Sequence, residues 1–111
     1  MPSIKKKGNI VRIFTLKGGA NYNLRNYRES AENYTKVIEA ETYKFSSVKR
    51  NRGISRYYDG DMEGALKDFI DMKKIILNFF ENQNKTKYKY RNPPYTEKDL
   101  EDINNWIENV K

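Results

Sequence analysis

The chain has 111 residues, enough for one domain with one modest hydrophobic core. It contains no cysteine and no histidine, which excludes disulfides, thiol nucleophiles, the usual zinc sites and the Ser-His and Cys-His dyads. The formal net charge is +7, and 33% of the residues are charged. No apolar run approaches the ~18 residues of a membrane-spanning helix, so we expect no membrane span.

The N-terminal stretch MPSIKKKGNIVRIF has a basic opening followed by an apolar patch that Arg12 interrupts. No small-residue cleavage site follows it. We therefore interpret this stretch as part of the mature protein rather than as a signal peptide, and we expect a cytoplasmic location.

A pattern of residue types occurs twice in the chain. When the sequence is aligned with itself at an offset of 35 residues, Gly18 aligns with Gly53. Small residues then align with small residues, and large apolar or aromatic residues align with residues of the same kind. Such a period indicates two copies of one supersecondary unit, here at about residues 11–45 and 46–80. The other matched pairs are Tyr22 with Tyr57, Asn23 with Tyr58, Asn26 with Asp61, Tyr27 with Met62, Ser30 with Ala65, Tyr34 with Phe69, and Val37 with Met72.

Each unit is predicted to consist of two helices. In the second unit, one helix covers 48–58, a turn follows at Asp59-Gly60, and Asp61 is the N-cap of a helix that continues to Phe80. This helix carries an apolar stripe at helical spacing. Its members are Ala65, Phe69, Met72 and Ile76.

Glycine costs about 1 kcal/mol relative to alanine inside a helix, so the glycines of this unit need a reason. We expect Gly53 and Ala65 to be the points at which two antiparallel helices approach closely. Phe69 would fill the space beside them, and Gly60 would form the turn.

The C-terminal part is predicted to be a linker and one more helix. Residues 81–95 contain Pro93-Pro94, which cannot continue a helix. Thr96 and the acidic residues after it begin a helix over 96–110. We expect its apolar stripe to cap the apolar end of the second unit; the alternative is an independent tail helix. The stripe consists of Leu100, Ile103, Ile107 and Val110.

The order and spacing of Gly53, Gly60-Asp61-Met62, Ala65 and Phe69 resemble the tetratricopeptide repeat (TPR) family, in a version common in cyanobacterial proteins. The first unit diverges, because Ser30 replaces the alanine. In the second unit Lys49 replaces a usual large residue, and the usual proline between repeats is absent. The resemblance implies two TPR-like helix-turn-helix repeats stacked as a short solenoid. Together with the predicted C-terminal capping helix, they make residues 1–111 a single all-α domain.

The same resemblance implies that the first helix of each unit lines a concave groove for segments of partner proteins. The family's carboxylate clamp is not expected here, because Thr15 and Gly19 occupy two of its places and only Asn51 agrees. The groove candidates are Arg12, Thr15, Tyr22, Arg50, Asn51, Ile54, Tyr57 and Tyr58.

Charge alternates in blocks along the chain. The net charge is +7 over 1–28, −3 over 29–43, +5 over 44–56, −4 over 57–72, +5 over 73–91 and −3 over 92–111. The first helix of each unit is therefore basic and the second largely acidic. Cations beside tyrosines suit an acidic peptide or helix with apolar anchors, whereas the alternative is a solvated face with i,i+4 pairs.

We therefore expect a non-catalytic protein–protein interaction module, an adaptor or assembly factor, with no metal and no cofactor; self-association stays open. No nucleophile with its base and no paired carboxylates stand out. The alternative is a basic nucleic-acid- or ribosome-associated protein. Residues 85–91 alternate cations with aromatic residues, which would bind phosphates and stack on bases, or would form a plain solvated linker.

Overall fold

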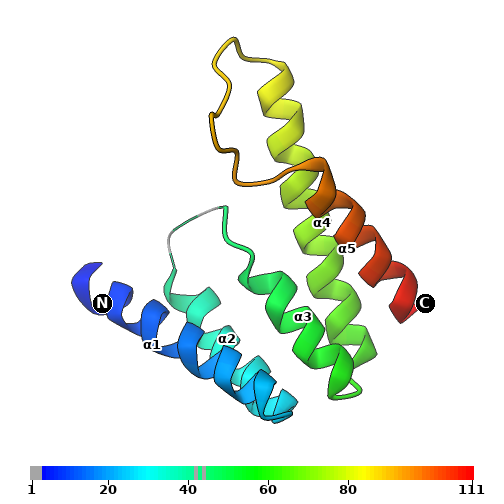
Figure 1. The fold of residues 1–111 in the computed structure, drawn as a ribbon. Helices are drawn as coiled ribbons and strands as arrows, with labels where there is room; N and C mark the ends of the chain where they lie inside the picture. Colours follow the sequence, from blue (N-terminus) through cyan, green and yellow to red (C-terminus); the bar gives the residue numbers. More distant parts are fainter. Residues whose placement is uncertain (1–3, 42, 44) are drawn as a thin grey trace.

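The computed structural model describes residues 4–41, 43 and 45–111, and this part of the chain is all-α, as predicted. Each helix packs on the next in chain order, and α3 makes a smaller contact with α5 (Figure 1). The helices are α1 (Ile4–Asn23), α2 (Tyr27–Ala40), α3 (Val48–Tyr58), α4 (Met62–Asn84) and α5 (Glu97–Val110).

The turn between α3 and α4 has the predicted chemistry. Gly60 has a φ of +87°, in the left-handed region that favours glycine. The Asp61 side chain caps α4 by accepting a hydrogen bond from the Gly64 N–H at 2.9 Å. At the matched places of the first hairpin, Arg25 has a φ of 64° and Asn26 forms no side-chain cap. The α1–α2 turn therefore has neither a glycine at its left-handed position nor a side-chain cap on the helix that follows.

Close helix contacts explain two of the glycines. A Cβ atom on Gly53 would lie 2.7 Å from Cε1 of Phe69, which is fully buried. A Cβ atom on Gly18 would lie 2.7 Å from Cε1 of Tyr34. The expected close approach at Gly53 is thus confirmed, and the first hairpin has an equivalent contact.

Ser30 occupies the place that alanine has in the second hairpin, and it is fully buried. Its hydroxyl donates to the Gly18 carbonyl at 2.7 Å, and it shares a hydrogen bond of 2.9 Å with the Ser55 hydroxyl of α3. Because a buried hydroxyl needs partners, this substitution links α1, α2 and α3.

The core is centred on α4, whose predicted stripe is buried and continues to Phe79. Ile103 and Ile107 of α5 belong to the same core, so α5 covers α4 instead of forming an independent tail. Helix α4 continues to Asn84, past the predicted start of the linker at residue 81. The Lys85–Glu81 ion pair of 3.1 Å lies at this extension.

Tyr95 is a core residue inside the predicted linker. Its side chain is 2% exposed, and its hydroxyl donates to the Ser46 carbonyl at 3.0 Å. The segment that follows α4 is therefore anchored to the segment that precedes α3.

We expect the Tyr95→Phe variant to change the pH dependence of stability. Burial, with smaller effects from Tyr43, Glu41 and Asp99, raises the pKa of Tyr95 from 10.0 to about 12. Because the folded state holds this proton more tightly, the stabilisation is complete below pH 10 and is lost as the pH rises towards 12. The loss is on the order of 2 kcal/mol.

Near neutral pH, Tyr95→Phe should be less stable by about 1 kcal/mol, the value of one hydrogen bond. Above pH 10 the difference should shrink and then reverse, because phenylalanine cannot ionise. Urea unfolding of both proteins across this pH range measures the difference. Parallel stability profiles would contradict the assignment.

Candidate functional site

A pocket of about 250 Å³ lies where α1, α3 and α5 face one another. Four of the eight groove candidates line it: Tyr22 from α1 and Arg50, Asn51 and Ile54 from α3. Tyr34 of α2 and Trp106 of α5 complete the lining. The residues selected from the repeat pattern are thus largely brought together, although α5 contributes a wall that was not predicted.

Tyr57 and Tyr58 lie beside this pocket in an aromatic cluster. Tyr58 stacks on Tyr27 with ring centroids 5.1 Å apart, and it contacts Tyr22 edge-on at 6.2 Å. Tyr57 contacts Trp106 edge-on at 5.6 Å. The cluster therefore joins the α1–α2 turn to the end of α3 and to α5.

Arg12 and Thr15 are not part of this pocket's lining. Arg12 is exposed and donates to the Asn9 side chain at 3.2 Å, within the first half of α1. Thr15 is half-buried. The structure thus separates these two candidates from the other six.

Arg50 forms a bidentate ion pair with Asp102 of α5. Its Nε lies 2.5 Å from one carboxylate oxygen, and Nη2 lies 3.3 Å from the other. The side chains are 36% and 40% exposed, so the pair lies at the solvent boundary. The guanidinium at the edge of the pocket is already engaged by an acid from the same chain.

The other cations of α3 also have acidic partners. Lys49 lies 3.8 Å from Asp71, and Arg52 and Arg56 both bind Asp68. The alternation of charge along the sequence therefore corresponds to ion pairs between neighbouring helices. The cations of α3 therefore form neither a free basic face nor pairs within their own helix, whereas i,i+4 and i,i+3 pairs occur at the ends of α4 and α5.

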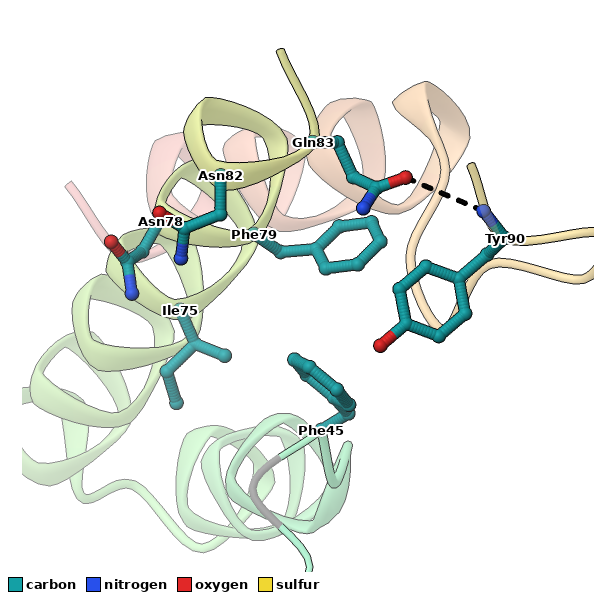
Figure 2. A pocket seen from close by; sticks show the side chains of 7 residues that line it. All are labelled: Phe45, Ile75, Asn78, Phe79, Asn82, Gln83 and Tyr90. Carbon is teal, nitrogen blue, oxygen red and sulfur yellow. Dashed lines mark hydrogen bonds between the residues drawn. The ribbon is translucent and has the colours of Figure 1, made fainter. Parts of the chain in front are cut away.

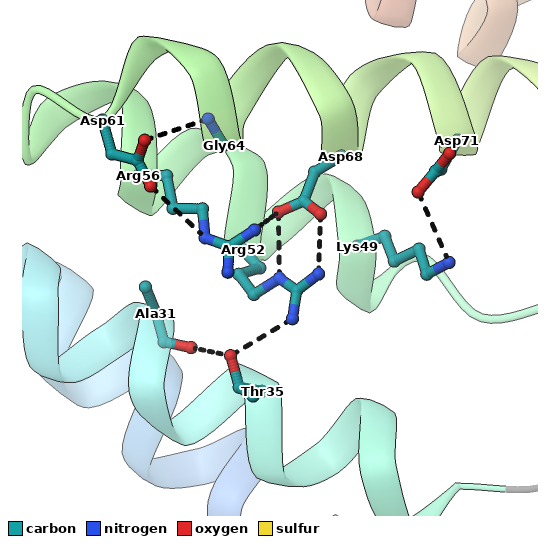
Figure 3. Close-up of polar contacts among 9 residues, drawn as sticks. All are labelled: Ala31, Thr35, Lys49, Arg52, Arg56, Asp61, Gly64, Asp68 and Asp71. Atoms are coloured by element: carbon teal, nitrogen blue, oxygen red, sulfur yellow. Dashed lines mark hydrogen bonds and ion pairs between the residues drawn. The ribbon is translucent and has the colours of Figure 1, made fainter.

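Asp68 lies at the centre of a polar network that joins three helices (Figure 3). Its side chain is 1% exposed and accepts two bonds from Arg52, at 2.7 and 2.9 Å, and one from Arg56 at 3.0 Å. Arg52 also donates to the Thr35 hydroxyl of α2 at 3.2 Å. The i,i+4 spacing of Arg52 and Arg56 was the available sequence signal, but nothing local identified Asp68 as their partner.

The tyrosine hydroxyls of the pocket are protonated at neutral pH. Burial raises the pKa of Tyr22; Tyr58 and Tyr27 raise it further, and Arg50 partly opposes the shift. Burial also raises the pKa of Tyr34. The pocket thus offers neutral phenol groups, one amide from Asn51, one guanidinium and the apolar surface of Ile54 and Trp106. This set suits hydrogen bonding and apolar contact.

Within the described ranges, no group of three or more acidic side chains is arranged to hold a metal ion. None of the helices in the same ranges is long and apolar enough to cross a membrane.

Comparison with models of known protein families finds no match to this chain, and comparisons with curated proteins and with solved structures find none either. The resemblance to TPR proteins therefore stays a prediction.

Proposed function

We propose that this protein is a non-catalytic, TPR-like interaction module, an adaptor or assembly factor, that binds an acidic segment of another protein. The binding site is the pocket between α1, α3 and α5. The observation that carries the proposal is the convergence of Tyr22, Arg50, Asn51 and Ile54 on that pocket, because the resemblance to TPR proteins implied a groove at these residues.

Matched contacts in the two helical hairpins support the TPR-like part of the proposal. Gly18 lies against Tyr34 and Gly53 against Phe69 at the same register, and Arg25 matches Gly60 as the left-handed turn residue. A similar close approach of paired helices in both hairpins is what a repeated unit requires.

The Arg50–Asp102 pair suggests how recognition works. Asp102 occupies the place that a partner's carboxylate would take on the guanidinium. Because exposed ion pairs contribute only about 0–1 kcal/mol, the exchange of one acid for another costs little. An apolar side chain of the partner would then contact Tyr22, Ile54 and Trp106. A pocket this small supports an affinity in roughly the micromolar range.

We expect Asp102→Asn to strengthen binding of an acidic peptide by up to about fivefold, because the competing ion pair contributes about 0–1 kcal/mol. Arg50→Glu should weaken binding by roughly tenfold or more. The first change frees the guanidinium, and the second replaces it with a repelling charge. The probe is a set of synthetic peptides that combine glutamates with leucine or phenylalanine, measured by fluorescence anisotropy against the same peptides with lysine in place of glutamate.

Lys49→Glu is the matched control, because it makes the same charge change one residue outside the pocket, at a pair that is about as exposed as Arg50–Asp102. The double variant Arg50→Glu/Asp102→Arg restores an ion pair with opposite polarity, so it should fold and yet lose the preference for acidic peptides. If Arg50→Glu and Lys49→Glu weaken binding equally, overall charge rather than the pocket accounts for it and the proposal fails.

A further inference from the structure

A second pocket, of about 310 Å³, lies against the C-terminal half of α4 (Figure 2). It shares no residue with the pocket between α1, α3 and α5. Three segments form it: α4, the residues before α3, and the segment that follows α4. Its lining residues are Phe45, Ile75, Asn78, Phe79, Asn82, Gln83 and Tyr90.

Three aromatic rings surround the interior of this pocket. Phe45 and Phe79 meet edge to face with centroids 5.5 Å apart, and Tyr90 lies 5.5 Å from Phe79 and 6.3 Å from Phe45. The Tyr90 N–H donates to the Gln83 side chain at 3.5 Å, and this contact helps to hold the ring over the end of α4 (Figure 2). Aromatic edges and faces of this kind suit a flat ring system.

Amide groups form the polar side of the pocket. Asn78 and Asn82 lie one helical turn apart on α4 and form no side-chain hydrogen bond with any residue that the structure describes. Each amide presents both a donor and an acceptor. This combination pairs with the edges of nucleobases, which also present donors and acceptors side by side.

A neighbouring hollow of about 340 Å³ shares Gln83 and Tyr90 with the pocket and extends it over Thr86, Tyr88 and Lys89. The Tyr88 side chain is 87% exposed. Because this ring is exposed and lies next to a pocket lined by other aromatic rings, it is available for stacking on a nucleobase.

Cations occur along the segment that contributes to both hollows, and Lys89 lines the second one. Residues 85–91 carry Lys85, Lys87, Lys89 and Arg91. Lys85 pairs with Glu81 and Lys89 donates to the Gln83 carbonyl, whereas Lys87 and Arg91 form no ion pair within the described part of the chain. Unlike the cations of α3, those of this segment are therefore largely not neutralised by acids and are open to phosphates.

We propose that this end of the molecule binds single-stranded nucleic acid. One base enters the pocket beside Phe45 and Tyr90, with its polar edge on Asn78 and Asn82. The next base stacks on Tyr88, and the phosphates lie along the cations of residues 85–91. The pocket volume is near the lower limit of small-molecule sites, about 300–1,000 Å³, which suits one base. Bases of a duplex are stacked and paired, so they cannot enter it.

The test is fluorescence anisotropy with a short labelled oligonucleotide, as single-stranded RNA, as single-stranded DNA and as a DNA duplex, at several salt concentrations. Both single strands should bind more tightly than the duplex. Tyr88→Ala should weaken binding roughly five- to a hundredfold through the lost stacking. Because Tyr88 is exposed, this variant should stay folded. Lys87→Ala/Lys89→Ala should reduce the salt slope by about 0.7 for each lost phosphate contact.

The matched control is Lys67→Ala/Lys98→Ala, which removes the same charge from exposed positions on α4 and α5. It should bind nearly as wild type does. Asn82→Leu should reduce the differences in affinity among oligo(A), oligo(C) and oligo(U), because the amide reads the base edge.

Three results would overturn the proposal: equal losses in the two lysine double variants, duplex binding as tight as single-strand binding, or no oligonucleotide binding even at the lowest salt concentration. Since the two pockets share no residue, each of these results leaves the proposal for the pocket between α1, α3 and α5 intact.

Discussion

Replacing Asp68 by alanine is expected to lower the free energy of unfolding by about 3–5 kcal/mol. The carboxylate is buried and is the shared partner of Arg52 and Arg56 (Figure 3). Its removal leaves the Arg52 guanidinium without an acidic partner, whereas Arg56 keeps the longer pair with Asp61 at 3.8 Å. The removal also frees Arg52 from the position in which it reaches Thr35 of α2. The variant should therefore weaken the packing of α2 on α3 as well as that of α3 on α4.

The matched control for this prediction is Asp71→Ala, on the same helix. Asp71 pairs with Lys49 at 3.8 Å, and the two side chains are about one-third exposed (35% and 34%). Pairs of this kind contribute about 0–1 kcal/mol. Urea unfolding, followed by circular dichroism, should separate the two variants clearly. If they lose the same small amount, Asp68 is not the centre of the network described here.

Replacing Gly53 by leucine is expected to cost 1–3 kcal/mol or more, even though leucine is the better helix former. The added Cβ would lie 2.7 Å from Phe69 and 3.1 Å from Cβ of Asp68, both of which are fully buried. Phe69 stacks on Trp106 and Asp68 is held by its two arginine partners, so we expect α3 and α4 to separate. A lower thermal midpoint and a lower urea midpoint are the measurements.

Gly8→Leu is the control for that prediction, because a Cβ atom on Gly8 of α1 would meet nothing within 4 Å. This change should be neutral or stabilising, by up to about 1 kcal/mol of helix propensity. If the Gly53→Leu variant has the same thermal midpoint as the Gly8→Leu variant, then α3 and α4 do not approach closely at Gly53.

The features that the sequence by itself determined are local ones. Helix α3 has its predicted bounds, Gly60 takes a left-handed conformation, and Asp61 caps α4. Each depends on residues within about one turn of one another, whose backbone preferences and hydrogen bonds hold in any tertiary context. The close contact at Gly53 was also predictable, because a glycine inside a helical pattern and the apolar stripe of the next helix indicate a short helical hairpin.

The features that only the tertiary structure decided connect distant residues. The blocks of charge in the sequence show which segments are basic or acidic, but they do not show which residues form ion pairs. Arg50 lies 52 residues from Asp102, and a sequence does not distinguish a charged side chain that is solvated from one that is paired. Tyr95 in the predicted linker and Trp106 beside the stripe of α5 acquired their roles in the same way.

Which surface of a helix faces a pocket depends on how its neighbours cross it, and packing decides that crossing. Helix α5 thus supplies a wall of the pocket through Trp106, and it also supplies Asp102, which forms the ion pair with Arg50. Periodicity places these two residues on a helix but leaves open which helix they meet.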